Sequence, residues 1–273
     1  MLRVIISSLL VFGLITGGCG RSHTGSRVEV SGSTVLLPLA RDAAAKFTAV
    51  NPGIKVNVSG GGSFTGLQQV AYGVVDIGVS DVEPPKGDSK YKGLVDHVVV
   101  LSSFALIIHR DAGVDNLTRE QAVGVFTGRI TNWRDVGGKD EDITVFNRPK
   151  SSGSRQVIKD LVLKGQEFTG SALTVNSNAE MREAVATTPG AIGFVATADL
   201  DDTVKALKYD SVACSRENIV NGTYPLRVPG HMYTKGEPRE AVKAYIDFVR
   251  GDSFSGEIRR MGFFLPSEVK NQI

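Results

Sequence analysis

The sequence predicts an α/β fold arranged as two lobes, and three observations support this prediction. A pattern of strand, hydroxyl-rich loop and amphipathic helix occurs three times along the chain. Glycine is plentiful, with 31 residues, while aromatic residues make up only 7%. This composition favours an α/β protein with many strand-to-helix turns over an aromatic-rich β-sandwich. A length of 273 residues suits one large domain or two modest lobes, and we favour two lobes.

The first two units of the pattern lie near the N-terminus, at residues 28–50 and 54–73. Each begins with residues that alternate between apolar and polar, as in a half-buried strand, and ends in a run with helical spacing. The loops between strand and helix are Ser31-Gly32-Ser33-Thr34 and Gly60-Gly61-Gly62-Ser63. Both units therefore predict a helix that starts directly after small and hydroxyl-bearing residues.

The third unit lies in the middle of the chain. Residues 143–146 predict a strand, residues 147–154 a loop, and residues 155–163 a helix. The loop ends in Ser151-Ser152-Gly153-Ser154, so a third helix start is built from hydroxyl residues and glycine.

These three junctions predict an anion-binding site. A helix start exposes unpaired N–H groups at the positive end of the helix dipole, and serine and threonine add hydroxyl donors. Any one of the junctions is also explained by ordinary N-capping. Three together favour a ligand, and Gly60-Gly61-Gly62 allows close approach of the backbone to it. None matches the phosphate-binding loop of nucleotide triphosphatases, because no Gly-Lys-Ser/Thr follows.

Two charged residues are expected beside these loops. Residues 76–81 read as a short buried strand that ends in Ser80-Asp81, at the sheet edge where ligands bind in open α/β sheets. Arg148 lies four residues before Ser152, where its guanidinium could hold an oxyanion through two parallel hydrogen bonds. The alternatives are a turn or capping role for Asp81 and a solvated charge for Arg148.

The N-terminus predicts export and lipidation. Arg3 precedes a short apolar run, and residues 1–18 read as a signal peptide that ends in Gly17-Gly18-Cys19. This ending resembles a bacterial lipobox, which would make Cys19 a lipidated N-terminus, and ordinary signal cleavage is the alternative. Residues 19–27 are predicted to be a polar tether. Cys214 then has no intrachain partner, and we expect it to be a buried small apolar residue.

Charge and histidine content exclude several function classes. A formal net charge of +2 gives no reason to expect a nucleic-acid partner. The four histidines are scattered, without the spacing of metal ligands or a catalytic triad, so we expect no metal and no cofactor. A phosphomonoesterase with a serine nucleophile was considered, but Gly62-Ser63-Phe64 lacks the Gly-x-Ser-x-Gly spacing of a nucleophile elbow. We therefore predict a binding protein.

Over essentially the whole mature chain, the sequence resembles the phosphate-binding proteins of bacterial ABC importers. The motifs that carry the resemblance are Gly32-Ser33-Thr34, Gly61-Gly62-Ser63-Phe64-Thr65-Gly66-Leu67, residues 76–81, Phe126-Thr127-Gly128 to Asn132-Trp133, Asn147-Arg148-Pro149, Ser151-Ser152-Gly153-Ser154-Arg155 and Gly190-Ala191-Ile192-Gly193-Phe194. The resemblance implies a type II periplasmic-binding fold with a ligand cleft between two lobes. It also implies a monomeric, membrane-anchored lipoprotein outside the cytoplasm, with the membrane subunits of an importer as partners.

The resemblance also implies the phosphate ligands and the lobe boundaries. The matching residues are Thr34, Val35, Ser63, Asp81, Arg148, Ser152, Gly153 and Ser154, with Ser33 and Ser80 as further candidates. Lobe I would comprise residues 28–105 and 228–273, and lobe II residues 106–227. Two departures are Ser154, where threonine is more common, and Lys150, where some members carry an aspartate that pairs with the arginine.

Asp81 is expected to select phosphate over sulfate. Phosphate keeps at least one proton near neutral pH, whereas sulfate keeps none, and a buried carboxylate accepts a hydrogen bond only from a protonated ligand oxygen. A binding protein for another tetrahedral oxyanion, such as sulfate or molybdate, is the main alternative. The sequence does not separate delivery to an importer from phosphate sensing.

Overall fold

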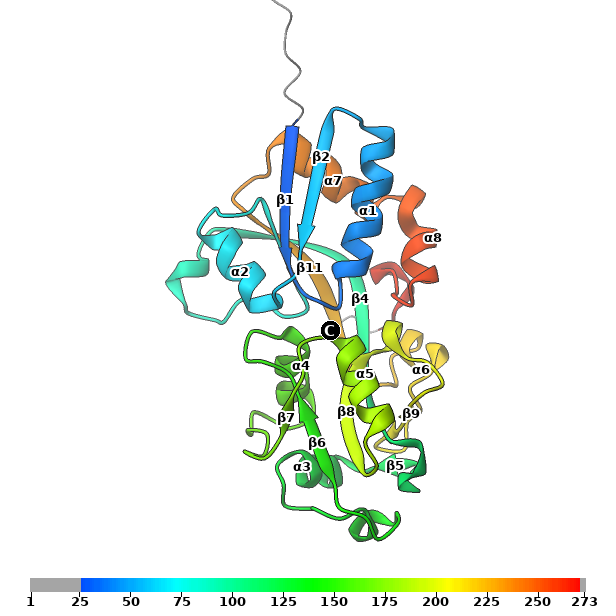
Figure 1. Cartoon of the computed structure of the whole chain (residues 1–273). Coiled ribbons are helices and arrows are strands. Elements are labelled where there is room, and N and C mark those ends of the chain that lie inside the picture. Colours follow the sequence, from blue (N-terminus) through cyan, green and yellow to red (C-terminus); the bar gives the residue numbers. More distant parts are fainter. Residues whose placement is uncertain (1–25, 271–273) are drawn as a thin grey trace, which may run out of the picture.

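The computed structural model describes residues 26–270, and Figure 1 shows two lobes stacked end to end. The helices are α1 (Leu37–Val50), α2 (Ser63–Ala71), α3 (Arg119–Phe126), α4 (Gly153–Leu161), α5 (Asn178–Thr187), α6 (Arg216–Val220), α7 (Glu240–Arg250) and α8 (Asp252–Arg260). The strands are β1 (Ser26–Gly32), β2 (Ile54–Ser59), β3 (Ile77–Ser80), β4 (Leu94–Ile108), β5 (Asn116–Leu117), β6 (Thr144–Asn147), β7 (Leu173–Thr174), β8 (Ala191–Ala196), β9 (Lys205–Ala206), β10 (Lys208–Tyr209) and β11 (Arg227–Lys235). The mixed α/β fold class predicted from the sequence is confirmed.

Strands of both lobes form one continuous sheet with the order β2-β1-β3-β11-β4-β8-β6-β7, to which β9 is added beside β4, while β5 and β10 form a separate two-stranded sheet. In the first lobe β1 is parallel to β2 and β3, while β11 is antiparallel to β3 and β4. In the second lobe β6 is parallel to β8. The carboxyl ends of β1, β2 and β6 carry the three hydroxyl-rich loops, and Asp81 follows the carboxyl end of β3. Ligands bind at such strand ends in open sheets.

The long strand β4 carries the chain from one lobe to the other. Its first part pairs with β11 as far as Ser103, and its last five residues, from Phe104, pair antiparallel with β8. The chain returns through β11, which begins at Arg227. This change of partner supports the predicted boundaries, residues 28–105 with 228–273 and residues 106–227, which we retain as a proposal.

The core of the first lobe is formed by the buried face of α1 against α7. Residues four apart on α1, such as Ala43 and Phe47, are buried because they lie on one face of the helix. The Phe47 ring meets Tyr245 of α7 edge to face, with 5.5 Å between centroids. The Tyr245 hydroxyl also donates to the Ala40 carbonyl over 2.8 Å. This packing holds the amino end of α1 against the lobe boundary.

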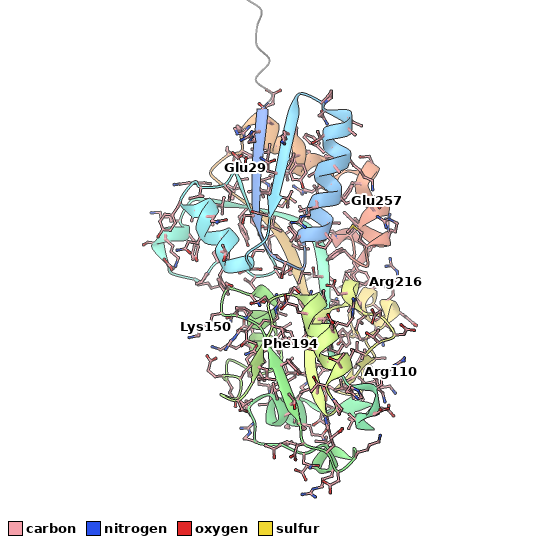
Figure 2. All side chains as sticks on the ribbon, viewed as in Figure 1. Glu29, Arg110, Lys150, Phe194, Arg216 and Glu257 are labelled. Carbon is pink, nitrogen blue, oxygen red and sulfur yellow. The ribbon has the colours of Figure 1, made fainter. Side chains whose placement is uncertain are left out.

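The second lobe has its own aromatic core. The ring centroids of Phe126, Phe168 and Phe194 lie within 6.2 Å of one another, and Phe126 meets the other two rings edge to face. Figure 2 shows Phe194 inside the lower lobe. Trp133, which the sequence placed in this lobe, is fully buried, and its Nε1 donates to the Gly190 carbonyl over 2.9 Å. Neither lobe depends on the other for these contacts.

Several sequence-based expectations need correction. β1 begins at Ser26, inside the range predicted as tether, because residues 26–31 pair with β2. Cys214 is only half-buried: its thiol hydrogen-bonds to Tyr224 at the edge of the core, and burial raises the pKa of the thiol to about 11. Residues 1–18 and Cys19 lie outside the described residues. Among those described, no helix combines the length and apolar character needed to cross a bilayer.

Candidate functional site

The amino ends of α1, α2 and α4 meet at the boundary between the lobes. α1 and α2 belong to the first lobe and α4 to the second (Figure 1). Two direct contacts join them: Arg148 Nη2 donates to Thr34 Oγ1 over 3.0 Å, and the Phe64 N–H donates to the Ser151 carbonyl over 3.1 Å. The three hydroxyl-rich loops predicted from the sequence therefore lie against one another.

The carboxylate of Asp81 is buried at the end of β3, with only 2% of the residue exposed. Its Oδ2 accepts hydrogen bonds from Ser33 Oγ at 2.5 Å and from Ser63 Oγ at 3.3 Å. Its Oδ1 is also buried and has no hydrogen-bond partner. Buried polar atoms are normally satisfied, because leaving one unpaired costs about 1–3 kcal/mol. Oδ1 is thus open to one further donor.

Burial raises the pKa of Asp81 to about 6. Hydrogen bonds from Ser33 and Ser63, together with the electrostatic influence of nearby His231 and Arg148, oppose the rise. Above that pH the carboxylate is ionised, and Oδ1 can only accept a hydrogen bond. Below it the protonated carboxyl can also donate, so the pH decides which ligands Asp81 can satisfy.

The guanidinium of Arg148 is buried on the opposite wall, directly after β6, with 2% of the residue exposed. Nη1 donates to Asn178 Oδ1 and Nη2 to the Asn176 carbonyl, both over 2.8 Å. Nε is buried and has no partner. Burial lowers the pKa of Arg148 and the charge of Asp81 opposes this, but arginine stays charged in proteins. Arg148 therefore brings a positive charge and an unused buried donor to the boundary between the lobes, where the residue lines a cavity.

Asn178 and Asn176 were missed by the sequence analysis. Asn178 is the first residue of α5, whose N-cap Ser177 accepts a hydrogen bond from the Glu180 N–H over 3.0 Å. The serine before an amphipathic run was a visible sign of a fourth helix start. Asn178 nevertheless lies 30 positions from Arg148 in sequence, so only the fold brings the two together.

The third loop places its serines and glycine directly opposite the first lobe. Ser152 Oγ accepts the Arg155 N–H over 3.3 Å and so acts as the N-cap of α4. This bond uses an oxygen lone pair and leaves the hydroxyl proton available, so capping and anion binding are compatible. Ser154 is buried. A Cβ on Gly153 would lie 2.2 Å from Ser63 Oγ, so only glycine allows this approach.

Ser33 and Ser80, the two further candidates, both use their hydroxyl groups in hydrogen bonds within the first lobe. Ser33 Oγ, besides donating to Asp81, accepts the Val35 N–H over 3.1 Å. Ser33 therefore orients the carboxylate from behind the first loop. Ser80 Oγ donates to the Val82 carbonyl over 2.6 Å and accepts the Val82 N–H over 3.1 Å, so its hydroxyl is used within its own turn.

Two cavities flank the contact between the loops. One of about 240 Å³ is lined by Thr34, Gly61, Gly62, Arg148, Pro149, Ser151, Ser152 and Asn176. The other, of about 420 Å³, is lined by Phe64, Asp81, Val82, Glu83, Pro84, Pro85, Lys86, Gln156, Val157, Asp160, Leu161, Val228, Pro229 and His231. Both have walls from the two lobes, so closing or opening of the lobes would change access to the polar atoms between them.

This arrangement suits a small oxyanion that carries a proton. A guanidinium and the positive ends of three helices favour negative charge, while Asp81 offers an acceptor to a ligand hydroxyl. Within residues 26–270, no group of histidine, cysteine and acidic side chains has the arrangement needed for a metal ion. Ser63 contacts a carboxylate rather than a histidine, which is not the geometry of an activated nucleophile.

Comparisons with known proteins agree with this chemistry. The family described as the PBP superfamily domain matches residues 20–253. The phosphate-binding protein PstS of Bacillus subtilis is 39% identical over 88% of this chain and 80% of its own length. PstS of Borreliella burgdorferi is 25% identical over 96% of this chain and 98% of its own length.

Solved structures show the same fold. A phosphate ABC transporter substrate-binding protein of Clostridium perfringens, with bound phosphate, matches 88% of this chain and 99% of its own, with a TM-score of 0.83 and 29% identity. An ABC-type phosphate transport receptor of Vibrio cholerae matches 88% of this chain and all of its own, with a TM-score of 0.77 and 30% identity. The chain therefore belongs to the PstS family of phosphate-binding proteins within the PBP superfamily.

Proposed function

We propose that this protein binds inorganic phosphate outside the cytoplasmic membrane and delivers it to an ABC-type importer. One observation carries the proposal: Asp81 Oδ1 and Arg148 Nε, on opposite walls of the cleft, are both buried and both lack a hydrogen-bond partner. An acceptor and a donor left open in this way match the P–OH and the charged oxygens of one hydrogen-phosphate ion. The names of the relatives support the same ligand.

The proposed contacts surround the anion from both lobes. Residues of the first lobe supply hydroxyl and N–H donors and the carboxylate, and residues of the second supply the guanidinium and the start of α4. The proposed phosphate ligands are Thr34, Val35, Ser63, Asp81, Arg148, Ser152, Gly153 and Ser154. Some six charge-assisted hydrogen bonds, at about 1.5–3 kcal/mol each, exceed the roughly 8 kcal/mol of micromolar binding. The surplus offsets desolvation of the anion and closure of the lobes.

We further propose that the protein is a binding protein rather than an enzyme, a monomer, and a lipoprotein. Diacylation of Cys19 and removal of residues 1–18 would make the modified cysteine the first residue, and the short segment before β1 would keep the lobes near the membrane. The membrane subunits of the importer are the proposed partners. Mass spectrometry of the membrane-extracted chain tests the anchor: it should detect a diacylglycerol-modified Cys19 as the first residue.

Calorimetric titration of the full-length protein in mild detergent tests the ligand. Phosphate is expected to bind at micromolar concentrations or below, and sulfate at least about a hundredfold more weakly, because an ionised Asp81 cannot be satisfied by sulfate. Equal binding of sulfate would favour the alternative of a general oxyanion receptor. Absence of heat and of any rise in melting temperature with phosphate would remove the proposal.

Gly62 should control closure of the cleft. Its φ is 97°, and a Cβ there would lie 2.4 Å from the Ser151 carbonyl of the other lobe. Gly62→Ala is therefore expected to hold the lobes apart and to weaken phosphate binding about ten- to hundredfold. Calorimetry measures the affinity, and small-angle X-ray scattering measures the compaction that phosphate induces.

The matched control is Gly61→Ala. Gly61 also has a positive φ, of 142°, but a Cβ there meets only the side chain of Thr65 in its own lobe, at 3.0 Å. Gly61→Ala introduces the same kind of backbone strain but no clash between the lobes. Its phosphate affinity should therefore fall less than that of Gly62→Ala. Equal losses in the two variants would show that strain, and not lobe closure, is responsible.

A further inference from the structure

The guanidinium of Arg148 is held by uncharged acceptors. Nη1 donates to the side-chain oxygen of Asn178, while Nη2 donates to the Asn176 carbonyl and to the Thr34 hydroxyl. None of the ion pairs among residues 26–270 involves Arg148. Buried arginines are usually paired with a carboxylate, because an uncompensated buried charge is costly. The positive charge is therefore left for whatever occupies the cleft.

A carboxylate does lie on this side of the guanidinium, but an amide separates the two. Asn178 Nδ2 donates to Asp199 Oδ2 over 2.7 Å, while Asn178 Oδ1 faces Arg148. Only this orientation of the amide satisfies both neighbours, because a carboxylate needs a donor and a guanidinium needs an acceptor. Asn178 is itself 4% exposed, and its bond to Arg148 is buried. Asn178 thus links the two charges without letting them touch.

The remaining charges around Arg148 are few. The carboxylates whose charge acts on it are Asp81 from the first lobe and Glu180 and Asp199 from the second. The Asp199 carboxylate accepts a hydrogen bond from Asn178, and the nearby charge of Arg182 opposes its own. Lys150, two residues after Arg148, is exposed at the lobe surface (Figure 2) and brings no negative charge. Asp81 is therefore the carboxylate that shares the cleft with Arg148.

We propose that Asn178 is a specificity-determining residue that makes the cleft prefer the dianion of phosphate over the monoanion. By holding Arg148 through an uncharged oxygen, it leaves the guanidinium without a hydrogen-bonded carboxylate, so its charge is available to balance a ligand with two negative charges. Hydrogen phosphate has those charges and still keeps one proton for Asp81 Oδ1. A carboxylate at position 178 would occupy the same hydrogen bond and neutralise the guanidinium, so the monoanion would become the better match. This inference rests on the proposed function.

The test replaces Asn178 with residues that separate charge from position. Asn178→Asp keeps the size and the acceptor for Arg148 but adds a negative charge, whereas Asn178→Ala removes the acceptor without adding charge. Both variants lose the donor to Asp199, so this loss is common to the two. Phosphate affinity is measured by calorimetry on the full-length protein between about pH 6 and about pH 8, a range in which the solution shifts from monoanion to dianion. Gln166→Glu, an amide-to-acid change at an exposed position of the second lobe, controls for net charge, because solvent screens it.

We expect a pH-dependent loss of phosphate affinity in Asn178→Asp only. Relative to the wild type, Asn178→Asp should bind phosphate about thirtyfold more weakly near pH 8, and the ratio should shrink towards pH 6. Asn178→Ala should show a smaller loss with an unchanged pH profile, and Gln166→Glu should bind like the wild type. If the wild type binds and the profiles of Asn178→Asp and Asn178→Ala coincide, the inference is wrong. Failure of the wild type to bind phosphate would instead overturn the proposed function.

Discussion

Arg148→Ala is expected to weaken phosphate binding by at least about 3 kcal/mol, or more than a hundredfold. Arg148 lies across the cleft from Asp81 and offers a buried Nε without a partner. Its removal deletes the positive charge of the second lobe at the site and leaves the oxygen of Asn178 without its donor. It also removes the bond to Thr34 that joins the lobes. Calorimetry and the phosphate-induced shift in melting temperature measure the loss.

Arg148→Lys separates charge from geometry in the same experiment. Lysine keeps the positive charge but cannot reproduce a planar fork of donors. We expect an intermediate affinity, because lysine can satisfy Asn178 or the anion but not both at once. If Arg148→Ala binds phosphate as tightly as the wild type, the third loop is not part of the binding site.

Asp81→Asn is expected to abolish the preference for phosphate over sulfate while retaining anion binding. In the wild type an ionised Asp81 faces any bound sulfate across a dry cleft, at a cost of roughly 3–5 kcal/mol. An asparagine can turn its NH₂ group towards an unprotonated oxygen and so satisfies sulfate. Sulfate affinity should therefore rise at least about a hundredfold, with a much smaller change for phosphate. An unchanged ratio of the two dissociation constants would remove Asp81 from this role.

The same variant predicts a change in stability with pH. The pKa of Asp81 is about 6 in the fold against 3.8 in a model peptide, so the folded state binds this proton more tightly than the unfolded state. Its contribution to the free energy of unfolding is full below pH 4 and is lost as the pH rises through 6. The difference amounts to about 3 kcal/mol, since one pKa unit corresponds to about 1.4 kcal/mol.

Denaturant unfolding of the ligand-free protein from about pH 4 to about pH 7 measures this effect. Asp81→Asn has no titrating group at this position, so its stability relative to the wild type should increase across the range. Bound phosphate should reduce the decrease in the unfolding free energy of the wild type as the pH rises, because its P–OH supplies the donor that the ionised Asp81 Oδ1 lacks. Parallel pH profiles for the two proteins would mean that Asp81 titrates normally.

The local features of the fold were predictable from the sequence. Alternation in residues 54–58 and the hydroxyl residues before residue 155 act within a few positions, so strand, loop and helix could be recognised without tertiary information. The start of α4 was predicted less accurately, because this helix begins at Gly153 and not at residue 155. α2 begins at Ser63 because Gly62, with a φ of 97°, ends the loop there, and the helical spacing of apolar residues did not reveal that turn.

The sequence indicated which residues form the candidate site, but not which residues are their hydrogen-bond partners. Asp81 and Arg148 were singled out from their positions after predicted strands, and the PstS-like family was recognised from the order of the motifs. The partners were not found: Ser33 behind Asp81, and Asn178 behind Arg148, are bonded across 48 and 30 positions of sequence. Such pairings depend on how strands are ordered in the sheet, which no local pattern records.

Helix starts rich in donors, one carboxylate and one guanidinium can be recognised from the residue order alone, because capping, turns and periodicity are short-range properties of the chain. It is the packing of distant segments that makes these groups face one another from two lobes. That packing also decides that Asp81 Oδ1 and Arg148 Nε are buried without partners, and that the pKa of Asp81 is raised to about 6. Side chains become buried only when segments distant in sequence pack together and exclude water. This loss of solvent raises the pKa of Asp81 and makes the unpaired atoms of Asp81 and Arg148 favour a ligand.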